Sequence, residues 1–436
     1  MSSVEVGFWS LGAVVILIAL RVPIGVALGG VGLLGIAYIR DFRIAYAVLG
    51  STPFEFAAHH TLSAIPMFLL MGAIAHGSGI SQSLFRAARL WLGGIPGGLA
   101  VATNYACAGF AAASGSSIAT AAAMAKIAVP EMLKAGYDRG LATGVVASAG
   151  TLGSMIPPSI MFVLFGVFAE VSIVKLLIAG IIPGLLTAFI YMVMIMVRST
   201  LNPALAPRLD PEEQRRLRPE RIRALLEIWP LLALMLGIIG GLYSGVVTPT
   251  EAGAAGAALA LLIALLQRRL SVARFVSSLI EATASTARIF FVAAAAALFA
   301  KFLAMTGMPF YFGSLLSELG SPLLLIVATS VIFTILGMFL DPIGLMLLTL
   351  PILLPMFEAQ GVDLIWFGVL TVKFLEIGLL TPPVGFNVYV IKATVGDAVP
   401  LAEIFRGVAW FLLCEFIVVV LLVLFPQIAL FLPNTM

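Results

Sequence analysis

Long, uninterrupted apolar segments dominate the pattern of hydrophobic and polar positions along this chain. Leu176–Val197 and Val408–Leu424 are examples of such segments. A helix of about 20 apolar residues spans the ~30 Å hydrocarbon core of a bilayer, so segments of this kind are typical of membrane-spanning helices. The strands of a membrane β-barrel would instead show roughly ten-residue segments of alternating hydrophobicity. The pattern therefore predicts an all-α integral membrane protein.

One long polar stretch interrupts this pattern. Arg198–Glu227 contains seven arginines and five acidic residues, and its prolines oppose a single continuous helix. Arginine-rich loops stay on the cytoplasmic side of a membrane. We therefore expect a cytoplasmic polar linker over residues 199–227, which joins a first half, 1–198, to a second half, 228–436.

The two halves are expected to have the same layout. Each begins with apolar helices and continues with an amphipathic stretch, Asp41–His60 or Ser271–Thr286, that would lie along the membrane interface. We assign residues 8–60 and 228–286 to scaffold helices. A hairpin and a broken helix should follow in each half, over about 97–170 and about 322–395.

A double proline occurs at the same place in both halves. Pro382 lies 225 residues after Pro157, and the same offset relates Gly378 to Gly153. Proline and glycine both disturb helices, and matched interruptions in two halves are typical of transporters built from repeats, with the binding site at the breaks. Residues 1–7 contain Glu5 but no Lys or Arg, which favours an external N-terminus. With the linker inside, the halves would form inverted repeats.

Small and polar residues predict a re-entrant helical hairpin in each half. The first tip lies within Gly109–Thr120 and includes Ser114 and Ser116. The second tip lies within Gly337–Gly344, where Asp341 corresponds to Ser116 at the 225-residue offset. Non-helical backbone at such a depth is tolerated only where protein or a water-filled cavity surrounds it. Hydroxyls, carbonyls and a carboxylate are suitable oxygen ligands for a small cation such as sodium.

Each of these features also has a purely structural interpretation. The serines of the first tip would pack helices together or bond to their own helix backbone. Asp341 before Pro342 is an ordinary helix N-cap. The double prolines free backbone carbonyls, which would meet either a cation or neighbouring helices and water. The recurrence of both elements, in the same order and at one offset, favours the functional interpretation.

Composition supports a membrane location and argues against several classes of function. Hydrophobic residues make up 61% of the chain and charged residues only 10%, against roughly 25% in soluble domains. The net charge of +3 gives no indication of a nucleic-acid partner. The two cysteines and three histidines lack metal-ligand spacing, and no Ser-His-Asp set or phosphate-binding loop is present. An enzymatic function is therefore not expected.

Lys373, Glu376 and Glu415 are charged residues within apolar segments of the second half. Lys373 and Glu376 are three residues apart and are expected to pair on one helix. Glu415 would pair with an interfacial charge or with another subunit, and the sequence does not decide between these alternatives.

The motifs taken together resemble one known family. Ile65-Pro66-Met67-Phe68, Ser114–Thr120 and Gly153–Ile160 in the first half, and Thr381–Asn387 in the second, are similar to the large membrane subunit of tripartite ATP-independent periplasmic (TRAP) transporters. These transporters belong to the ion-transporter superfamily. The resemblance covers nearly the whole chain.

The resemblance implies a permease subunit of a sodium-coupled importer in a bacterial inner membrane, with a periplasmic N-terminus. Its substrates would be small organic anions, such as C4-dicarboxylates or sugar acids. An elevator mechanism is implied, in which a transport domain slides against a scaffold. Two protein partners are also implied: a small four-helix membrane subunit, expected here as a separate chain, and a periplasmic substrate-binding protein.

The resemblance further implies two sodium sites and a substrate site between the tips. The first sodium site would use the Ser114 and Ser116 side chains and carbonyls from Gly153 to Pro157. The second would use Asp341, carbonyls from Gly378 to Pro382, and the Thr381 hydroxyl. The polar substrate contacts expected between the tips are Thr120, Ser159 and Asn387.

Two other functions remain as alternatives. One is a stand-alone sodium/dicarboxylate-type transporter of the same repeat architecture, which would need no binding protein. The other is a non-transporting membrane scaffold, which would show no cation specificity and would tolerate loss of the Asp341 carboxylate.

Overall fold

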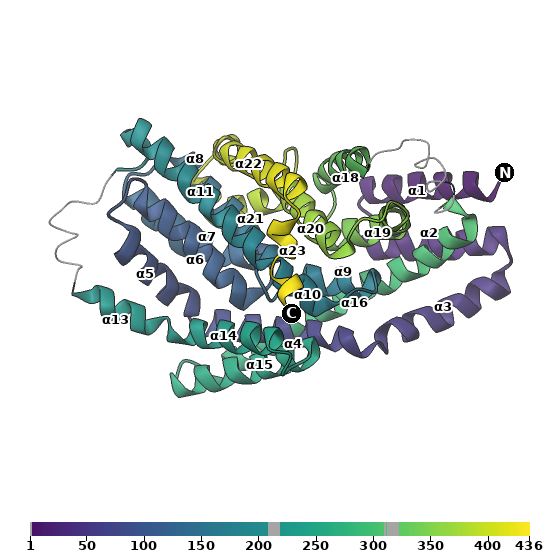
Figure 1. The fold of residues 1–436 in the computed structure, drawn as a ribbon, viewed down its shortest axis with the longest axis horizontal. Coiled ribbons are helices and arrows are strands. Elements are labelled where there is room, and N and C mark those ends of the chain that lie inside the picture. The colour runs from purple at the N-terminus through teal and green to yellow at the C-terminus, as the bar shows by residue number, and fades with distance from the viewer. Residues whose placement is uncertain (1, 208–218, 309–310, 312–321) are drawn as a thin grey trace.

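The computed structural model describes residues 2–207, 219–308, 311 and 322–436. Helices and the turns between them make up all of this part of the chain, and no strand occurs in it. Figure 1 shows the helices as an elongated bundle, with the N-terminus at one end of the long axis and the C-terminus near the middle. The all-α class predicted from the sequence is therefore confirmed.

The helices of the two halves follow one another with short connections. In the first half they are α1 (Ser3–Ala19), α2 (Ile24–Ile39), α3 (Phe42–Ala57), α4 (Ala64–Gly77), α5 (Ile80–Leu92), α6 (Gly98–Ser114), α7 (Ser117–Lys134), α8 (Arg139–Met155), α9 (Ile160–Phe168), α10 (Ile173–Ala179) and α11 (Ile181–Leu201). In the second half they are α13 (Glu220–Glu227), α14 (Trp229–Tyr243), α15 (Pro249–Leu266), α16 (Val272–Thr306), α18 (Pro322–Gly337), α19 (Pro342–Ala359), α20 (Leu364–Leu380), α21 (Phe386–Val395), α22 (Leu401–Leu424) and α23 (Gln427–Leu430).

Many of these helices are long and apolar enough to cross a membrane. Among the described residues, six helical segments meet this condition by length and composition, and eight do so if each of two bent helix pairs counts as one span. One of the bent pairs is α8–α9, which turns by 42° at the first double proline. The structure thus has the helices of a multi-pass membrane protein, with a broken helix where the sequence predicts one.

The scaffold helices of the second half were expected to end at residue 286, but no helix ends there. Val272–Thr306 forms one continuous 35-residue helix, α16, so the expected interfacial stretch and the apolar helix after it are a single element. This segment contains no glycine or proline, and the helix ends only at Gly307, in the left-handed conformation. In the first half, the 3₁₀ turn His60–Ser63 separates α3 from α4. Expecting the second half to break where the first does was wrong.

The expected polar linker is partly helical. Its central residues, 208–218, lie outside the described residues. On one side, α11 continues to Leu201, and the Arg198 guanidinium lies over the Trp410 ring at 4.5 Å. On the other side, Glu220–Glu227 forms α13, whose Glu220 pairs with Arg86 at 2.8 Å. The linker is therefore attached to the membrane helices at both of its ends.

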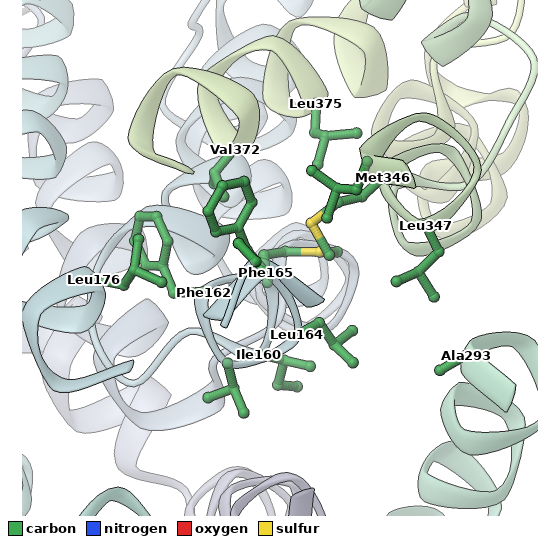
Figure 2. Close-up of a cluster of buried hydrophobic side chains, with 14 of the residues drawn as sticks. Ile160, Phe162, Leu164, Phe165, Leu176, Ala293, Met346, Leu347, Val372 and Leu375 are labelled. Atoms are coloured by element: carbon green, nitrogen blue, oxygen red, sulfur yellow. The ribbon is translucent and has the colours of Figure 1, made fainter. Parts of the chain in front are cut away.

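The second part of the broken helix, α9, lies in the centre of the apolar core. Its residues Ile160–Gly166 are all buried, as expected for a short helix that is hydrophobic on every side. Figure 2 shows Phe162 and Phe165 of α9 packed near Leu176 of α10 and Val372 of α20. This packing holds the chain in place immediately after the double proline.

Glycines allow α8 and α22 to approach closely. A Cβ atom on Gly407 would lie 1.8 Å from the Gly140 carbonyl oxygen, and one on Gly144 would lie 2.7 Å from the Gly407 carbonyl carbon. Small residues at such crossings bring helix backbones into contact in a membrane. The long closing helix α22 is thereby packed directly against the first part of the broken helix.

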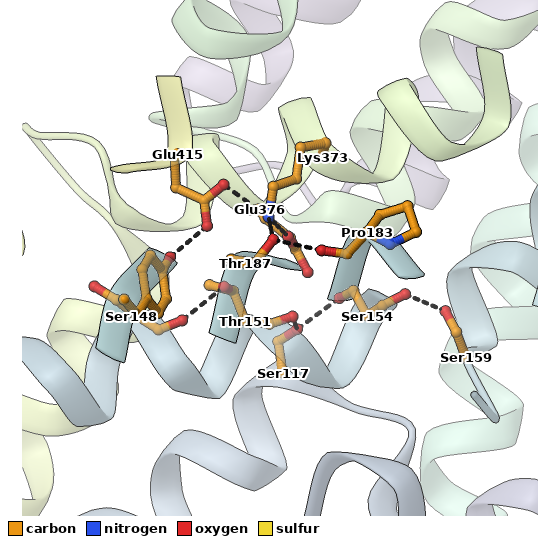
Figure 3. A network of polar contacts seen from close by, with 11 residues as sticks. Ser117, Ser148, Thr151, Ser154, Ser159, Pro183, Thr187, Lys373, Glu376 and Glu415 are labelled. Carbon is orange, nitrogen blue, oxygen red and sulfur yellow. Dashed lines mark hydrogen bonds and ion pairs between the residues drawn. The ribbon is translucent and has the colours of Figure 1, made fainter. Parts of the chain in front are cut away.

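A buried ion-pair cluster joins α11, α20 and α22 (Figure 3). Lys373 Nζ lies 2.8 Å from Glu376 Oε2, 2.7 Å from Glu415 Oε2 and 3.0 Å from Thr187 Oγ1. Tyr191 donates a further hydrogen bond to the other Glu415 oxygen. The three charged side chains have no exposed surface. The pairing of Lys373 with Glu376 agrees with the sequence, and Glu415 joins the same lysine rather than an interfacial charge.

We predict that Lys373→Met strongly destabilises the protein. It leaves two buried carboxylates without their cation, and breaking a buried pair from one side typically costs about 3–5 kcal/mol. The measurement is the thermal unfolding midpoint of the purified protein in detergent. Lys301→Met, which removes a partly exposed lysine 2.8 Å from the exposed Glu55, is the control and should have little effect. An equal, small effect of both changes would contradict a structural role for the cluster.

Candidate functional site

The first hairpin has its tip where the sequence predicts it. Helix α6 ends at Ser114, Gly115 takes the left-handed conformation at φ 62°, and Ser116 caps α7 by accepting a hydrogen bond from the Ala119 N–H at 3.4 Å. A Cβ atom on Gly115 would lie 2.5 Å from the Pro158 carbonyl oxygen. Only glycine fits here, and the tip therefore lies directly against the first double proline.

The second hairpin ends in the same way. Helix α18 ends at Gly337, and Asp341 caps α19 by accepting a hydrogen bond from the Gly344 N–H at 3.0 Å. A Cβ atom on Gly337 would lie 2.9 Å from Gly378 Cα, which belongs to the helix that breaks at the second double proline. Each tip thus contacts the break of its own half. In Figure 1, the α6–α7 hairpin and the α18–α19 hairpin lie on opposite sides of the centre.

Serine hydroxyls replace part of the hydrogen bonding lost at the first break. Pro157 and Pro158 lack the N–H groups that would bond the Gly153 and Ser154 carbonyls. Ser159 donates a hydrogen bond to the Ser154 carbonyl, as Figure 3 shows. From the tip of the hairpin, Ser117 Oγ donates to the Thr151 carbonyl at 3.0 Å and lies 2.5 Å from Ser154 Oγ. The side chains of the tip therefore complete the end of the broken helix.

At the second break, fewer side-chain hydrogen bonds replace those that the helix loses. Helix α20 ends at Leu380, and Pro382 and Pro383 lack the N–H groups that would bond the Gly378 and Leu379 carbonyls. The Thr381 N–H is shared between the Ile377 and Gly378 carbonyls, at 3.0 and 3.3 Å. The peptide bond between the two prolines is cis at this break and at the first.

One cavity of about 660 Å³ brings the two tips together. Ser116, Ser117 and Ser154 of the first half and Asp341 of the second line it. Ser116 and Asp341, which occupy matching positions 225 residues apart in the two halves, therefore line the same cavity. Helix α16 contributes the other polar lining residues, Glu281, Ser285 and Arg288.

The residues predicted to bind sodium lie at these tips and breaks, but they differ in accessibility. Ser116 and Asp341 line the cavity. Ser114 is buried, with its hydroxyl 2.7 Å from that of Thr120. A Cβ atom on Gly153 would lie 2.8 Å from the Ser116 carbonyl oxygen, so this part of the first break touches the tip. Pro157 is buried beside it, whereas Thr381 Oγ1 donates to its own helix at 2.6 Å and Pro382 is exposed.

The three predicted substrate contacts are not among the described residues that line the cavity. Thr120, Ser159 and Asn387 are fully buried. Thr120 bonds to Ser114, Ser159 bonds to the broken helix, and Asn387 Nδ2 donates to the Ala147 carbonyl at 3.0 Å, which joins α21 to α8. Their side chains hold the helix ends around the site, and direct contact with a substrate stays a prediction for each of them.

Sequence reasoning missed the part of the cavity that α16 forms. Glu281, Ser285 and Arg288 are spaced by four and three residues, which places them on one face of a helix. This spacing, together with an arginine inside a long apolar helix, was a signal available in the sequence. The spacing was overlooked because a helix was expected to end near residue 286, which placed Arg288 on a different element from Glu281 and Ser285.

Two further cavities extend the first one towards a basic region. A cavity of about 170 Å³ shares Ser116 and Glu281 with the tip cavity and also includes His76. A cavity of about 600 Å³ shares His76 and is lined by Arg86, Arg269 and Arg274. Glu227, at the end of α13, lines it as well. The three cavities therefore form a series from the tips to the side of the molecule where the polar linker attaches.

Comparison with known proteins gives a consistent assignment. The family described as "Tripartite ATP-independent periplasmic transporter, DctM component" matches residues 11–428. The C4-dicarboxylate TRAP transporter large permease protein DctM of Pseudomonas aeruginosa is 39% identical over 385 residues, which cover 87% of this chain and 88% of that protein. The sialic acid TRAP transporter large permease protein SiaM of Vibrio cholerae is 32% identical over 428 residues, covering 94% and 98%.

A solved structure supports the fold. The YdaH transporter of Alcanivorax borkumensis aligns with a TM-score of 0.56 at 15% identity, covering 95% of this chain and 98% of that one. At this identity the likeness concerns the fold alone. The family match and the two permeases carry the assignment, and the relatives are transporter subunits rather than enzymes. The chain belongs to the DctM family, the large permease subunits of TRAP transporters, and is a multi-pass membrane protein.

Proposed function

We propose that this chain is the permease subunit of a sodium-coupled, binding-protein-dependent importer of small organic anions. The observation that carries this proposal is the shared cavity of Ser116 and Asp341, two oxygen-bearing side chains from matching positions in the two halves. An ionisable residue at a helix start within a membrane protein is a functional candidate by default. Carboxylates such as C4-dicarboxylates or sugar acids are the proposed substrates, in keeping with the relative named for C4-dicarboxylates.

The chemistry of the tips suits sodium. The first proposed site combines the Ser114 and Ser116 side chains with carbonyls from Gly153 to Pro157. The second combines Asp341 with carbonyls from Gly378 to Pro382 and the Thr381 hydroxyl. In both, prolines leave carbonyls without their helical donors, and a bound cation would satisfy those carbonyls at mid-membrane depth. Thr381 Oγ1, which now donates to its own helix, would have to turn to take part.

An elevator mechanism with inverted repeats, 1–198 and 228–436, is part of the proposal. It is supported by the tip-against-break arrangement in both halves and by the two hairpins on opposite sides of the centre (Figure 1). The hairpins, broken helices and the substrate between the tips would move together. The series of cavities from the tips to the polar linker suits release towards the linker side, which would be the cytoplasm.

Membership of the TRAP family implies two partner proteins, a small membrane subunit and a substrate-binding protein. We propose that the small subunit is a separate four-helix chain, that the binding protein is periplasmic, and that the assembly lies in a bacterial inner membrane with the N-terminus of this chain in the periplasm. The arginines at both ends of the polar linker support this orientation.

We predict that sodium stabilises the purified protein more than potassium or choline does at equal ionic strength. A ligand at about 100 times its dissociation constant stabilises the state it binds by about 2.7 kcal/mol. Asp341→Ala should remove most of the sodium-specific rise in the thermal unfolding midpoint, and Ser116→Ala should reduce it, because each change removes a proposed ligand.

The control for this experiment is Asp363→Ala. Asp363 also caps a helix, α20, accepting from the Ile365 N–H at 2.7 Å, but it does not line the tip cavity. Loss of a cap costs about 1 kcal/mol whichever cation is present. Asp341→Ala and Asp363→Ala should therefore share this general loss, while only the former loses the sodium-specific part. A sodium effect that survives in both Asp341→Ala and Ser116→Ala would contradict the proposed sites.

We further predict that uptake depends on both partner proteins. In proteoliposomes with an inward sodium gradient, labelled succinate should accumulate only when the small subunit and the binding protein are both present. Each of the two alternatives predicts a different result. Uptake by this chain alone would favour a stand-alone transporter, and unchanged uptake by Asp341→Ala in the full assembly would favour a scaffold role.

A further inference from the structure

An arginine lies near the middle of the apolar helix α16. Arg288 is near the middle of this 35-residue helix, which is apolar enough to cross a membrane. A charged side chain at the centre of a membrane helix costs at least about 2.5–3.5 kcal/mol unless it faces a cavity or a partner. Arg288 lines the tip cavity together with Ser116 and Asp341, so its charge faces that space.

The guanidinium is not neutralised by the described residues. Arg288 is exposed, and the described part of the chain offers it no ion pair or hydrogen bond. The nearest carboxylate along the same face of α16 is Glu281, which is about 10 Å away along the helix axis because each residue rises by ~1.5 Å. By contrast, Lys301 of the same helix pairs with Glu55 at 2.8 Å. The Arg288 guanidinium therefore has five N–H donors available to a ligand in the cavity.

The net charge of the tip cavity changes sign when the two proposed sodium ions bind. Arg288 is the only positive side chain among its described lining residues, and Glu281 and Asp341 are the negative ones. The lining is thus net negative when empty and repels an anion. With the two proposed sodium ions bound it becomes net positive. An anion would then be attracted to a site whose permanent positive group is Arg288.

Arg288 also lies on a different part of the structure from the tips. It belongs to α16, which packs mainly against α2 and α4 and also contacts α19, whereas Ser116 and Asp341 cap α7 and α19, the second helices of the two hairpins. A guanidinium binds a carboxylate through two parallel hydrogen bonds. A substrate with one carboxylate at the tips would be able to place a second one on α16.

We propose that Arg288 binds one carboxylate of the transported anion and makes the cavity selective for dicarboxylates over monocarboxylates. This inference rests on the proposed sodium-coupled function. It assigns to α16 a specificity-determining residue that the tips and breaks do not supply. Glu281, which lines the same cavity, would lower the affinity for the anion through repulsion.

The test uses the protein purified together with its small membrane subunit, in sodium. The thermal unfolding midpoint is measured against increasing succinate, and separately against succinamate, in which one carboxylate is replaced by an amide. Arg288→Gln should weaken the apparent affinity for succinate about 10- to 100-fold, as expected for loss of a charged hydrogen-bonded pair. It should also remove most of the preference for succinate over succinamate, and Arg288→Lys should be intermediate.

Two variants serve as matched controls. Lys301→Gln removes a positive charge from the same helix outside the cavity and should leave the affinity unchanged. Glu281→Gln removes a negative charge from the cavity and should increase the affinity for succinate. The sodium-specific stabilisation measured without succinate should be at least as large in Arg288→Gln as in wild type, because the variant removes a positive charge from the cavity. A retained sodium response shows that the variant is folded and keeps its cation sites.

Three results would overturn the proposal, each in a distinguishable way. Equal succinate affinity in wild type and Arg288→Gln would exclude Arg288 as the anchor. A wild-type protein that responds to sodium but not to succinate would exclude a C4-dicarboxylate at Arg288 while leaving the sodium-coupled function in place. A wild-type protein without any sodium-specific response would reject the proposed function itself.

Discussion

The arrangement of this protein depends on one constraint, that backbone groups at helix ends inside a membrane must find partners within the protein or in a bound ligand. Four helices end near its centre, two at hairpin tips and two at double prolines. The tips meet the breaks through glycines, at Gly115 and Pro158 in one half and at Gly337 and Gly378 in the other. Side chains from both tips and from the first break line one cavity, so the same interruptions that would destabilise an isolated helix place oxygen-bearing groups in one space.

Charged side chains inside the membrane must also find partners, and this protein contains two kinds of them. The Lys373 cluster is closed, since its lysine contacts both carboxylates and has no exposed surface, and it ties α20 to α22 and α11. Asp341 and Arg288 instead face the tip cavity. A charge that is neutralised within the protein stabilises the packing, whereas a charge that faces a cavity is available to an ion or a substrate.

Local signals predicted much of this structure. Pro157 and Pro382 mark the breaks because proline lacks the N–H that a helix needs, and Gly115 and Asp341 mark the tips because their conformational and capping preferences are strong. The predicted end of a helix near residue 286 was wrong because it relied on the first half as a template, while the second half has neither proline nor glycine there. Thr120 and Ser159 bond to Ser114 and Ser154, only six and five positions away, whereas Asn387 bonds to Ala147, 240 residues away, a contact that no local pattern indicates.

The sequence by itself determined the helical membrane class, the repeated interruptions and the pair Ser116 and Asp341, because periodicity, composition and helix-breaking residues act over a few neighbouring positions. Only the tertiary structure decided which helices share a space. It brought α16 to the tips, so that Arg288 and Asp341 line one cavity, and it joined Glu415 to Lys373. The physical reason is that residues far apart in the sequence become neighbours only through helix packing. Local sequence patterns do not specify that packing.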